Sequence, residues 1–464
     1  MRTILLLCLC TLNARAMTLD EYMGLVLKKN KLVTSYETSI EASKEKQLAG
    51  DVLLDPTLTA GYSVNRDQSI QSVFVIADRR STTAANLGLT KKFSTGTTLG
   101  LTAQTFKYEY DLPVVPGNNG YSTGGLGISL QQSLWRDSFG VATRLRQDRE
   151  SVTNKLETLG FELQKRLTLI QVESDFWDYL VAREDLKLKQ ANFDRAKKID
   201  SWTSNRVNNG ISDQSDLLQI RALTELRELE LASAQTTLTT REAKIKENLD
   251  FSQLETLPEL TANMTDARPY VQDLAQKKNV VKIDTYLISL EAEVKQKVSQ
   301  EVVESLRPDL ALIGKYNTSS YNVDDREMQQ NIAKTDRPVT FVGVSFSWLF
   351  GSAKNSQIAA ATKDALASQY KAEQAKISGE NAWRELLRQY DLSKQNVLTL
   401  GKIAQLQRDR AKAEQIKFTK GRSITFNVVN AETDAAQAEV NYLTAKSGLR
   451  KLEASTQLFV SIAE

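Results

Sequence analysis

RVNNGISDQSDLLQ (residues 206–219) and KFTKGRSITFNVVN (residues 417–430) share one sequence pattern. In each, a glycine, Gly210 or Gly421, and a short polar turn precede a long run of apolar residues at helical spacing. Glycine readily takes the left-handed conformation that ends many helices, so each phrase predicts the turn between two antiparallel helices. The sequence therefore predicts two helical hairpins with matching tips.

Each turn also offers a cap for the helix that follows it. Ser212 and Ser423 come two residues after the glycines, and serine is a favoured residue at the position that precedes a helix. We expect the two capped tips to stand side by side at one end of a long rod.

Two long stretches without proline contain these turns, at residues 134–257 and 339–464. Proline inside a helix costs about 3 kcal/mol, so both stretches are free to form very long helices. Apolar or small residues recur there at alternating steps of four and three, which is the pattern of helices that supercoil against neighbours. The positions of this predicted seam are Leu163, Leu167, Ile170, Ser174, Trp177 and Val181 in the first stretch, and Ala431, Ala435, Ala438, Tyr442, Ala445, Leu449, Leu452 and Thr456 in the second.

The first sixteen residues, 1–16, have the features of a secretory signal peptide. A basic residue precedes a short apolar core, and residues 14–16 fit the small-residue pattern that signal peptidase cleaves. The core is too short for a membrane anchor, which needs about 20 apolar residues. Because Cys8 and Cys10 are the only cysteines, the exported chain from Met17 onward is expected to have neither a thiol nor a disulfide.

Composition excludes several classes of function. The full chain has a formal net charge of +3 at pH 7, which is too small to attract a nucleic-acid backbone. It has no histidine, which excludes a Ser-His-Asp triad, a Cys-His pair and every His-ligated metal site. No motif arranges carboxylates or lysines for catalysis, so we expect neither an enzyme nor a cofactor or metal site.

Four segments have the periodicity of strands rather than helices. They are TLTAGYSVN (57–65), GLGISLQQSL (125–134), DLALIGKY (309–316) and TFVGVSFSWLF (340–350). Aliphatic and polar residues alternate in each, which gives one apolar and one polar face. Taken singly, such a strand more often belongs to a soluble sandwich than to a membrane wall. Segments of about ten residues in an exported chain favour tilted outer-membrane strands, with Trp135, Trp348 and Phe350 in an aromatic girdle at their ends.

The chain is internally duplicated. The order helix, strands, helical hairpin occurs in residues 17–250 and again in residues 274–464, and residues 251–273 read as an irregular linker or belt beside the helices. The few strands of one chain cannot close a barrel, because the smallest membrane barrels have about eight. An open sheet edge in lipid leaves backbone groups without hydrogen bonds, so we expect several copies to share one wall.

Together these features resemble the outer membrane efflux protein family, the TolC-like exit ducts. The resemblance rests on the duplicated order, the paired glycine tips, the strand entries DPTL and RPDL, and the strand exits SLQQSLWRDSFG and VGVSFSWLFGSAKN. It covers essentially the whole exported chain. It implies an α+β membrane protein, a homotrimer whose shared transmembrane β-barrel is continuous with a long periplasmic α-helical barrel.

The resemblance also implies a function. Such a duct lies in outer-membrane lipid, docks on a periplasmic adaptor protein and passively carries substrates from an inner-membrane pump, in tripartite efflux or type I secretion. A periplasmic coiled-coil scaffold or adaptor is the alternative, although it leaves the amphipathic strands unexplained. The sequence names neither cargo, pump nor adaptor, and drug efflux and protein secretion both stay open.

Site residues follow from the resemblance as well, because in this family adaptors contact the tips and the tunnel narrows where the second helix of each hairpin begins. The matching tip residues are Gly210, Ile211, Ser212, Gly421, Arg422 and Ser423, and the matching entrance residues are Asp213, Asp216, Asn427 and Asn430. Many members carry aspartates where this chain has the two asparagines, so we expect a weaker cation-binding ring.

Ion pairs at the tips are expected to hold the entrance closed. Asp213 or Asp216 would pair with a basic tip residue, and each exposed pair would contribute roughly 0 to 1 kcal/mol. The basic candidates are Arg206, Lys420 and Arg422. Adaptor docking would replace these contacts and widen the entrance.

An insertion, roughly Arg66 to Thr123, separates the two strands of the first half and has no counterpart in the second. It contains its own hairpin, LGLTKKF and TTLGLTAQTF around a tight turn at Ser94–Gly96. If this hairpin joins the wall, a trimer has 18 strands; if it folds elsewhere, the trimer has the 12 of the family. We expect 12, because a helical tunnel would fix the size of the ring.

Overall fold

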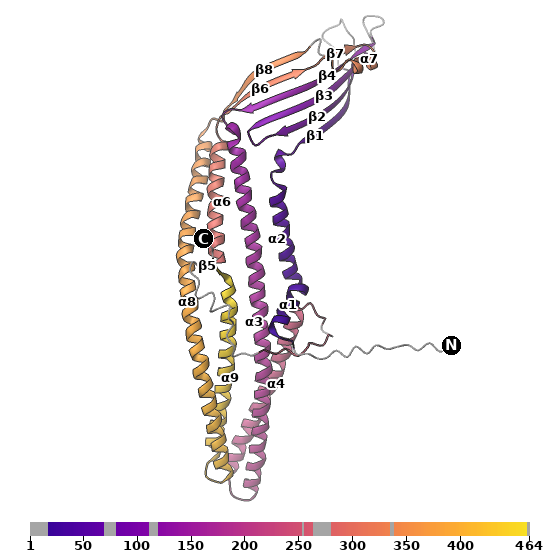
Figure 1. Ribbon diagram of the computed structural model, residues 1–464. Coiled ribbons are helices and arrows are strands. Elements are labelled where there is room, and N and C mark those ends of the chain that lie inside the picture. Colours follow the sequence, from indigo (N-terminus) through magenta and orange to yellow (C-terminus); the bar gives the residue numbers. More distant parts are fainter. Residues whose placement is uncertain are drawn as a thin grey trace, which may run out of the picture. The chain divides into compact units, whose positions relative to one another are not determined.

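The computed structural model of the chain describes residues 17–68, 80–110, 119–252, 255–262, 280–334 and 338–461 (Figure 1). The predicted signal peptide lies outside these residues. The chain divides into two compact units. The helical unit comprises Met1–Ala42, Glu157–Leu287 and Gln374–Glu464, and the strand unit comprises Ser43–Leu156 and Ile288–Glu373.

Long helices and antiparallel strands alternate along the chain. The α-helices are α1 (Leu19–Lys29), α2 (Lys31–Ala49), α3 (Val141–Asn208), α4 (Gln214–Asn248), α6 (Ile283–Ser305), α7 (Asp325–Gln330), α8 (Ser352–Thr419) and α9 (Thr425–Ser455). The strands are β1 (Thr57–Asp67), β2 (Arg80–Lys92), β3 (Thr97–Tyr110), β4 (Gly120–Ser133), β5 (Val280–Lys282), β6 (Asp309–Asn317), β7 (Ser320–Asn322), β8 (Val339–Ser347) and β9 (Phe459–Ser461). None of the described helices has an apolar run long enough to cross a membrane.

Both predicted helical hairpins are present, α3 with α4 and α8 with α9. Helices α3 and α8 each run for 68 residues without a break before the turn. That length is possible because no proline interrupts either helix.

The main core of the helical unit forms where α1 packs on α3 and on the end of α4. A capping box, in which Thr18 and Glu21 exchange hydrogen bonds, starts α1. Tyr22 of α1 is fully buried and packs on Phe176 of α3, with ring centroids 5.2 Å apart. Leu260, from the predicted linker, is also fully buried in this core. The described part of the linker therefore packs beside the helices.

The predicted seam is only partly right. In α9 and at the residue after it, five seam positions are buried: Ala431, Ala435, Ala438, Leu449 and Thr456. In the predicted segment of α3 the buried face is instead formed by Val172, Glu173, Asp175, Phe176, Trp177 and Leu180. Of the predicted α3 positions only Trp177 is buried, because α1, α4 and the linker, rather than a single parallel helix, pack against this part of α3.

A small second sheet was not predicted. Strand β5 pairs antiparallel with β9 at the end of the chain. Phe459 of β9 packs on Trp383 of α8, with ring centroids 5.0 Å apart. The first helix of the second repeat, α6, begins at Ile283, directly after β5. Residues 274–279, where this repeat was predicted to start, lie outside the described residues.

The strand unit contains one large antiparallel sheet with the strand order β1-β2-β3-β4-β6-β8 (Figure 1). Strand β7 pairs with β4 in the same register as β6 and so extends that strand after a short break. Helix α7 follows β7, and its Met328 is buried. The four predicted strand segments correspond to β1, β4, β6 and β8.

The prediction that the inserted hairpin folds away from the wall is wrong. Its strands, β2 and β3, lie between β1 and β4 in the same sheet. Strand β2 pairs with β1 from Thr57 to Asp67, and β3 pairs with β4 from Thr97 to Glu109. Because the two ladders are continuous, removing the hairpin from the sheet would leave β1 without a partner.

Candidate functional site

Both hairpin tips have the same backbone conformation. Gly210 and Gly421 have φ angles of 70° and 72°, which is the left-handed conformation that the sequence predicts. The N–H groups of Gly210 and Ile211 donate to the carbonyls of Val207 and Arg206, at 2.9 and 2.8 Å. The second tip repeats both hydrogen bonds, at 3.0 and 2.8 Å. Each helix thus ends in a Schellman motif, which satisfies its last carbonyl groups.

The tip serines do not cap the returning helices, contrary to the prediction. Helices α4 and α9 begin one residue later than predicted, with Asp213 and Ile424 at the capping position. Neither residue makes a side-chain capping bond. Ser212 and Ser423 are not available as caps, because carboxylates bind both hydroxyl groups.

Those carboxylates lie on opposite sides of the two turns. Ser212 donates forward to Asp216 of α4, at 2.9 Å between Oγ and Oδ2. Ser423 donates backward to Glu414 of α8, at 2.8 Å. Hydrogen bonds from Lys417 and Ser423 hold the pKa of the Glu414 carboxyl below its usual range, so it stays ionised. The two tips therefore have the same backbone conformation but different side-chain contacts.

An aromatic cluster joins the two hairpins close to their tips. Trp202 of α3 and Phe418 of α8 pack with ring centroids 4.5 Å apart, and the Arg206 guanidinium lies over both rings at 4.9 and 5.5 Å. The other members are Ile199, Ile220, Val428 and Val429. Because all four long helices contribute, the two tips stand side by side, as the sequence predicts.

The predicted entrance residues occupy the start of the returning helices. Asp216 lies in the first turn of α4 and Asn427 in the first turn of α9. Asp213 and Asn427 are exposed, whereas Asp216 and Asn430 are half-buried. The aligned positions in the two hairpins therefore carry one carboxylate and one amide, as the sequence predicts.

The predicted closing ion pairs do not form within one chain. Among the described residues, neither Asp213 nor Asp216 pairs with a basic tip residue. Asp216 accepts from Ser212, and Arg206 stacks on the aromatic cluster instead. The Ser212 hydroxyl and the aromatic rings are nearby partners that compete with the predicted ion pairs for Asp216 and Arg206.

The exposed side chains of the two tips have opposite orders. After its glycine the first tip has Ile211 and then Asp213, whereas the second has Arg422 and then Ile424. Ile211 and Ile424 are 64% and 63% exposed. Each tip thus presents one aliphatic and one charged residue, with the two positions exchanged and the sign of the charge reversed.

The sheet of the strand unit has a continuous apolar face. The register places Leu58, Leu89, Leu101, Ile128 and Tyr316 in one row across five strands, and all five are exposed. Further exposed members of this face are Tyr62, Val64, Leu87, Leu126, Leu130, Leu312, Val342, Val344 and Phe346. Exposed apolar patches of this extent mark surfaces that contact lipid or another protein.

Exposed aromatic residues follow the ends of two strands in this sheet. Trp135 comes just after β4, and Trp348 and Phe350 come just after β8. The rings of Trp348 and Phe350 pack with centroids 4.3 Å apart. These are the positions at which the sequence predicts a girdle, and aromatic girdles lie where a membrane wall meets water.

The opposite face of the sheet is polar and more crowded. A Cβ added at Gly61 would lie 2.4 Å from Asn86 Oδ1, and one added at Gly100 would lie 2.5 Å from Ser129 Oγ. On the apolar face a Cβ added at Gly314 would meet nothing within 4 Å. Side chains of neighbouring strands converge on the concave side of a curved sheet, which indicates that the polar face is the inner one.

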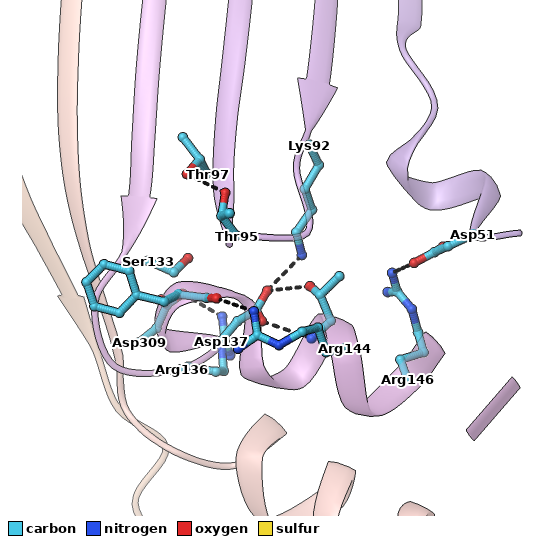
Figure 2. A network of polar contacts seen from close by, with 12 residues as sticks. Asp51, Lys92, Thr95, Thr97, Ser133, Arg136, Asp137, Arg144, Arg146 and Asp309 are labelled. Atoms are coloured by element: carbon cyan, nitrogen blue, oxygen red, sulfur yellow. Dashed lines mark hydrogen bonds and ion pairs between the residues drawn. The ribbon is translucent and has the colours of Figure 1, made fainter. Parts of the chain in front are cut away.

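Asp137 connects the inserted hairpin to the turn between β4 and α3 (Figure 2). Its Oδ2 lies 3.0 Å from Lys92 Nζ at the end of β2. The N–H and hydroxyl of Thr143 donate to the same carboxylate at 2.9 and 2.7 Å. Burial raises the pKa of the Asp137 carboxyl, but the hydrogen bonds from Thr143 and Lys92 outweigh this effect, and the net pKa is below its usual range.

Two glycines allow these turns to pack closely. Gly96, at the tip of the inserted hairpin, and Gly140 both have positive φ angles, 71° and 82°. A Cβ added at Gly140 would lie 1.6 Å from the Ser94 carbonyl oxygen, and one added at Gly96 would lie 2.6 Å from that of Asp137. The turn of the inserted hairpin therefore fits directly against the turn that leads into α3.

Sequence reasoning missed both the aromatic cluster and the role of Asp137. Trp202 and Phe418 lie in the last turns before the two glycines, so their position in the sequence was a usable signal. For Asp137 the signal was a polar turn with a glycine directly after a strand. The described residues contain no group of three or more acidic, histidine or cysteine side chains that could hold a metal ion.

No protein-family model and no curated protein matches the sequence. Solved structures do match. The outer-membrane channel OprN is 14% identical, with a TM-score of 0.69 over 95% of this chain and 88% of that one. The outer membrane protein VceC of Vibrio cholerae is 10% identical, with a TM-score of 0.67 over 95% of both chains. The MtrE outer membrane channel of Neisseria gonorrhoeae, solved in its open state, is 13% identical, with a TM-score of 0.64 over 94% of this chain and 87% of that one.

These matches establish the fold. The chain has the α+β fold of outer-membrane channels along nearly its whole length. The predicted resemblance to the TolC-like family is confirmed at the level of the fold.

Proposed function

We propose that this chain is the outer-membrane exit duct of a tripartite efflux or type I secretion system. Three copies share one transmembrane wall, and substrates from an inner-membrane pump pass through it without any chemistry. The observation that carries the proposal is the exposed apolar face of the sheet, on a chain with the fold of outer-membrane channels. That face is unfavourable in water, whereas it is the expected outer surface of a barrel in lipid.

The edges of the sheet support a shared wall. Strands β1 and β8 end the strand order, and each has a partner on only one side among the described residues. Unpaired backbone groups are costly in lipid, so β8 of one copy would pair with β1 of the next. With six long strands in each copy, a trimer would have 18 strands rather than the 12 expected from the sequence. Barrels of 16 to 18 strands leave an aqueous channel.

The same proposal extends to the organisation of the chain. Residues 17–250 and 274–464 would be two copies of one repeat, joined by residues 251–273, and residues 1–16 would be removed on export. The shared hairpin turns support this division, because both carry the same two hydrogen bonds around a left-handed glycine. The hairpins would extend into the periplasm.

The hairpin tips would form the periplasmic entrance and its docking surface. Docking would use Gly210, Ile211, Ser212, Gly421, Arg422 and Ser423, and the entrance would be lined by Asp213, Asp216, Asn427 and Asn430. The exposed isoleucines and the weak contacts of the exposed charges support this assignment, because such contacts are easily exchanged for those of a partner.

The opposite order of the two tips specifies the chemistry of the adaptor. An adaptor that contacts both tips would place a basic or neutral donor near Asp213 and a carboxylate near Arg422. It would also need apolar side chains in exchanged positions to cover Ile211 and Ile424. One adaptor surface cannot suit both tips equally, so each copy of the chain would offer two different docking sites.

The first test is the native mass of the protein extracted in mild detergent from washed outer membranes. A particle of three chains is expected. A monomer that is soluble without detergent would refute the duct and would support the alternative, a periplasmic coiled-coil scaffold or adaptor.

The second test is charge reversal at the tip. Arg422→Glu should weaken adaptor binding or raise the leak conductance of the duct, because it places a carboxylate where the partner's own is expected. Lys371→Glu makes the same charge change at an exposed position of α8, outside the tip, and serves as the matched control. If both variants bind adaptor and conduct as the wild type does, the tip assignment is wrong.

A further inference from the structure

The inner face of the wall is almost free of charge. The register places mostly hydroxyl, amide and glycine residues along the middle of β1 to β4 on this face, whereas the middle of β6 contributes the apolar Ala311 and Ile313. Representative side chains are Ser63, Asn86, Thr102, Gln104, Ser129 and Ser345. A wall of this composition attracts neither cations nor anions strongly.

Charged residues on the inner face gather at the ends of the strands, where each stands near an opposite charge. Lys92 pairs with Asp137 at 3.0 Å. Asp309, at the start of β6, pairs with Arg136 at 2.5 Å. At the other end of the sheet, the last residue of β1 stands opposite the first residue of β2, an aspartate across from an arginine. These charges largely cancel within the wall.

Lys315 is the exception. It lies two residues before the end of β6, opposite Ser129 of β4 and Phe341 of β8, and β7 continues the sheet beyond it. Lys315 comes six positions after Asp309, which corresponds to about 20 Å along a strand. Its side chain is exposed, and it forms no ion pair with any carboxylate of the described residues. It is therefore a full positive charge on an otherwise neutral part of the wall.

Phe341 and Gly343 of β8 position the Lys315 side chain on this face. The Lys315 ammonium lies over the ring of Phe341, 6.0 Å from its centroid. The ring folds back over Gly343, where a Cβ would lie 2.6 Å from the ring. Glycine at this position leaves room for the ring against the wall, and the electron-rich face of the ring attracts the ammonium without neutralising its charge.

We propose that Lys315 gives the outer-membrane lumen a preference for anions. The inference rests on the proposed function, because three copies of the chain would place three ammonium groups around one pore. Rings of lysine or arginine select anions in other pores, and low-dielectric walls strengthen the field of such charges. Substrates that carry carboxylate or phosphate groups would enter this part of the duct more readily than small cations of the same size.

The test is the reversal potential of the purified trimer in planar lipid bilayers under a KCl gradient. The wild type should pass chloride more readily than potassium. Lys315→Gln should reduce the chloride-to-potassium permeability ratio several-fold, and Lys315→Glu should reduce it further. Lys107→Gln removes the same charge from the opposite, outward face of β3 and should leave the ratio unchanged.

The possible outcomes distinguish a failure of the predicted anion preference from a failure of the proposed duct. Channels that conduct with the same ratio in all three Lys315 forms would overturn the inference and leave the duct intact. A wild-type trimer that forms no pore would overturn the duct, and the inference with it.

A second measurement does not depend on conductance. The exported chain has no native cysteine if residues 1–16 are removed, so single cysteines can be labelled selectively. In intact outer membranes Lys315→Cys should react with a water-soluble maleimide, whereas Ile128→Cys, on the apolar face, should not. Equal labelling of both would show that the two faces are assigned wrongly, and Lys315 would then not line the pore.

Discussion

Replacing Phe418 with alanine would test whether the aromatic cluster holds the two hairpin tips together. Phe418 is 2% exposed, and its ring contacts Trp202 of the other hairpin at 4.5 Å and Arg206 at 5.5 Å. The truncation removes all of these contacts at once and leaves a cavity between the hairpins. We expect the tips to separate transiently far more often than in the wild type.

The magnitude follows from the burial of the ring. Truncating a buried phenylalanine to alanine costs about 3 to 5 kcal/mol, of which the lost contact between the two rings contributes about 0.5 to 1.5 kcal/mol. If the tips open locally, a cost of 3 kcal/mol lowers the protection of their amides from hydrogen exchange about a hundredfold. Amides in the core around Tyr22 lie in another cluster and should keep their protection.

Hydrogen exchange measured by mass spectrometry on peptides covering residues 195–225 and 410–435 is the assay. Phe426→Ala is the matched control, because Phe426 is 56% exposed and surface truncations usually change stability by less than about 0.5 kcal/mol. If the two variants exchange at the same rate near the tips, the cluster does not join the hairpins. If protection is lost equally around Tyr22, the effect is global and the reasoning about the tips fails.

Two further predictions concern the turns. Gly421→Ala should destabilise the second tip by about 1 to 2 kcal/mol, because a Cβ is unfavourable at a φ of 72°. Gly448→Ala, inside α9 where a Cβ meets nothing within 4 Å, should instead stabilise the helix by up to about 1 kcal/mol, and thermal unfolding that ranks the two variants the other way would contradict this. The Asp137 carboxyl has a lowered pKa in the folded chain, so its contribution to stability is present above the unfolded pKa of about 4 and is lost as the pH falls through the folded value. Asp137→Asn should remove that part of the pH dependence, and urea unfolding in detergent between pH 2 and 6 that keeps the same slope would show that the carboxylate is not responsible.

The hairpins and strands could be predicted because their signals are local. A glycine with a left-handed φ, a long stretch without proline and strict alternation are each visible within about ten residues. Gly210 and Gly421 show this most clearly, since both the conformation and the turn follow from the sequence phrase. The start of the returning helix was predicted one residue too early. Ser212 binds the Asp216 carboxylate instead of capping the helix, so Asp213 takes the capping position.

The neighbours of each strand could not be predicted in the same way. Alternation assigns Leu58 and Leu89 to an apolar face, but any strand with such a face satisfies the pattern equally well. Strands β1 to β4 follow one another as a meander, whereas the pairing of β4 with β6 joins segments that are far apart in sequence. The expectation of 12 strands rested on ring size alone and gave no weight to the turn of the inserted hairpin, which at Gly96 fits closely against the turn that leads into α3.

The predicted seam of α3 also shows what a single chain cannot reveal. Leu167, a predicted seam residue, is 41% exposed, although its heptad neighbours repeat as a coiled coil requires. A sequence records every surface that is buried in the functional molecule, including those that only another copy covers. In the proposed duct the exposed Leu167 would contact another copy of the chain, whereas α1, α4 and the linker cover the buried face of α3. In the proposed duct the same reasoning applies to β1 and β8, each of which has one strand neighbour among the described residues and would pair with a strand of a second copy.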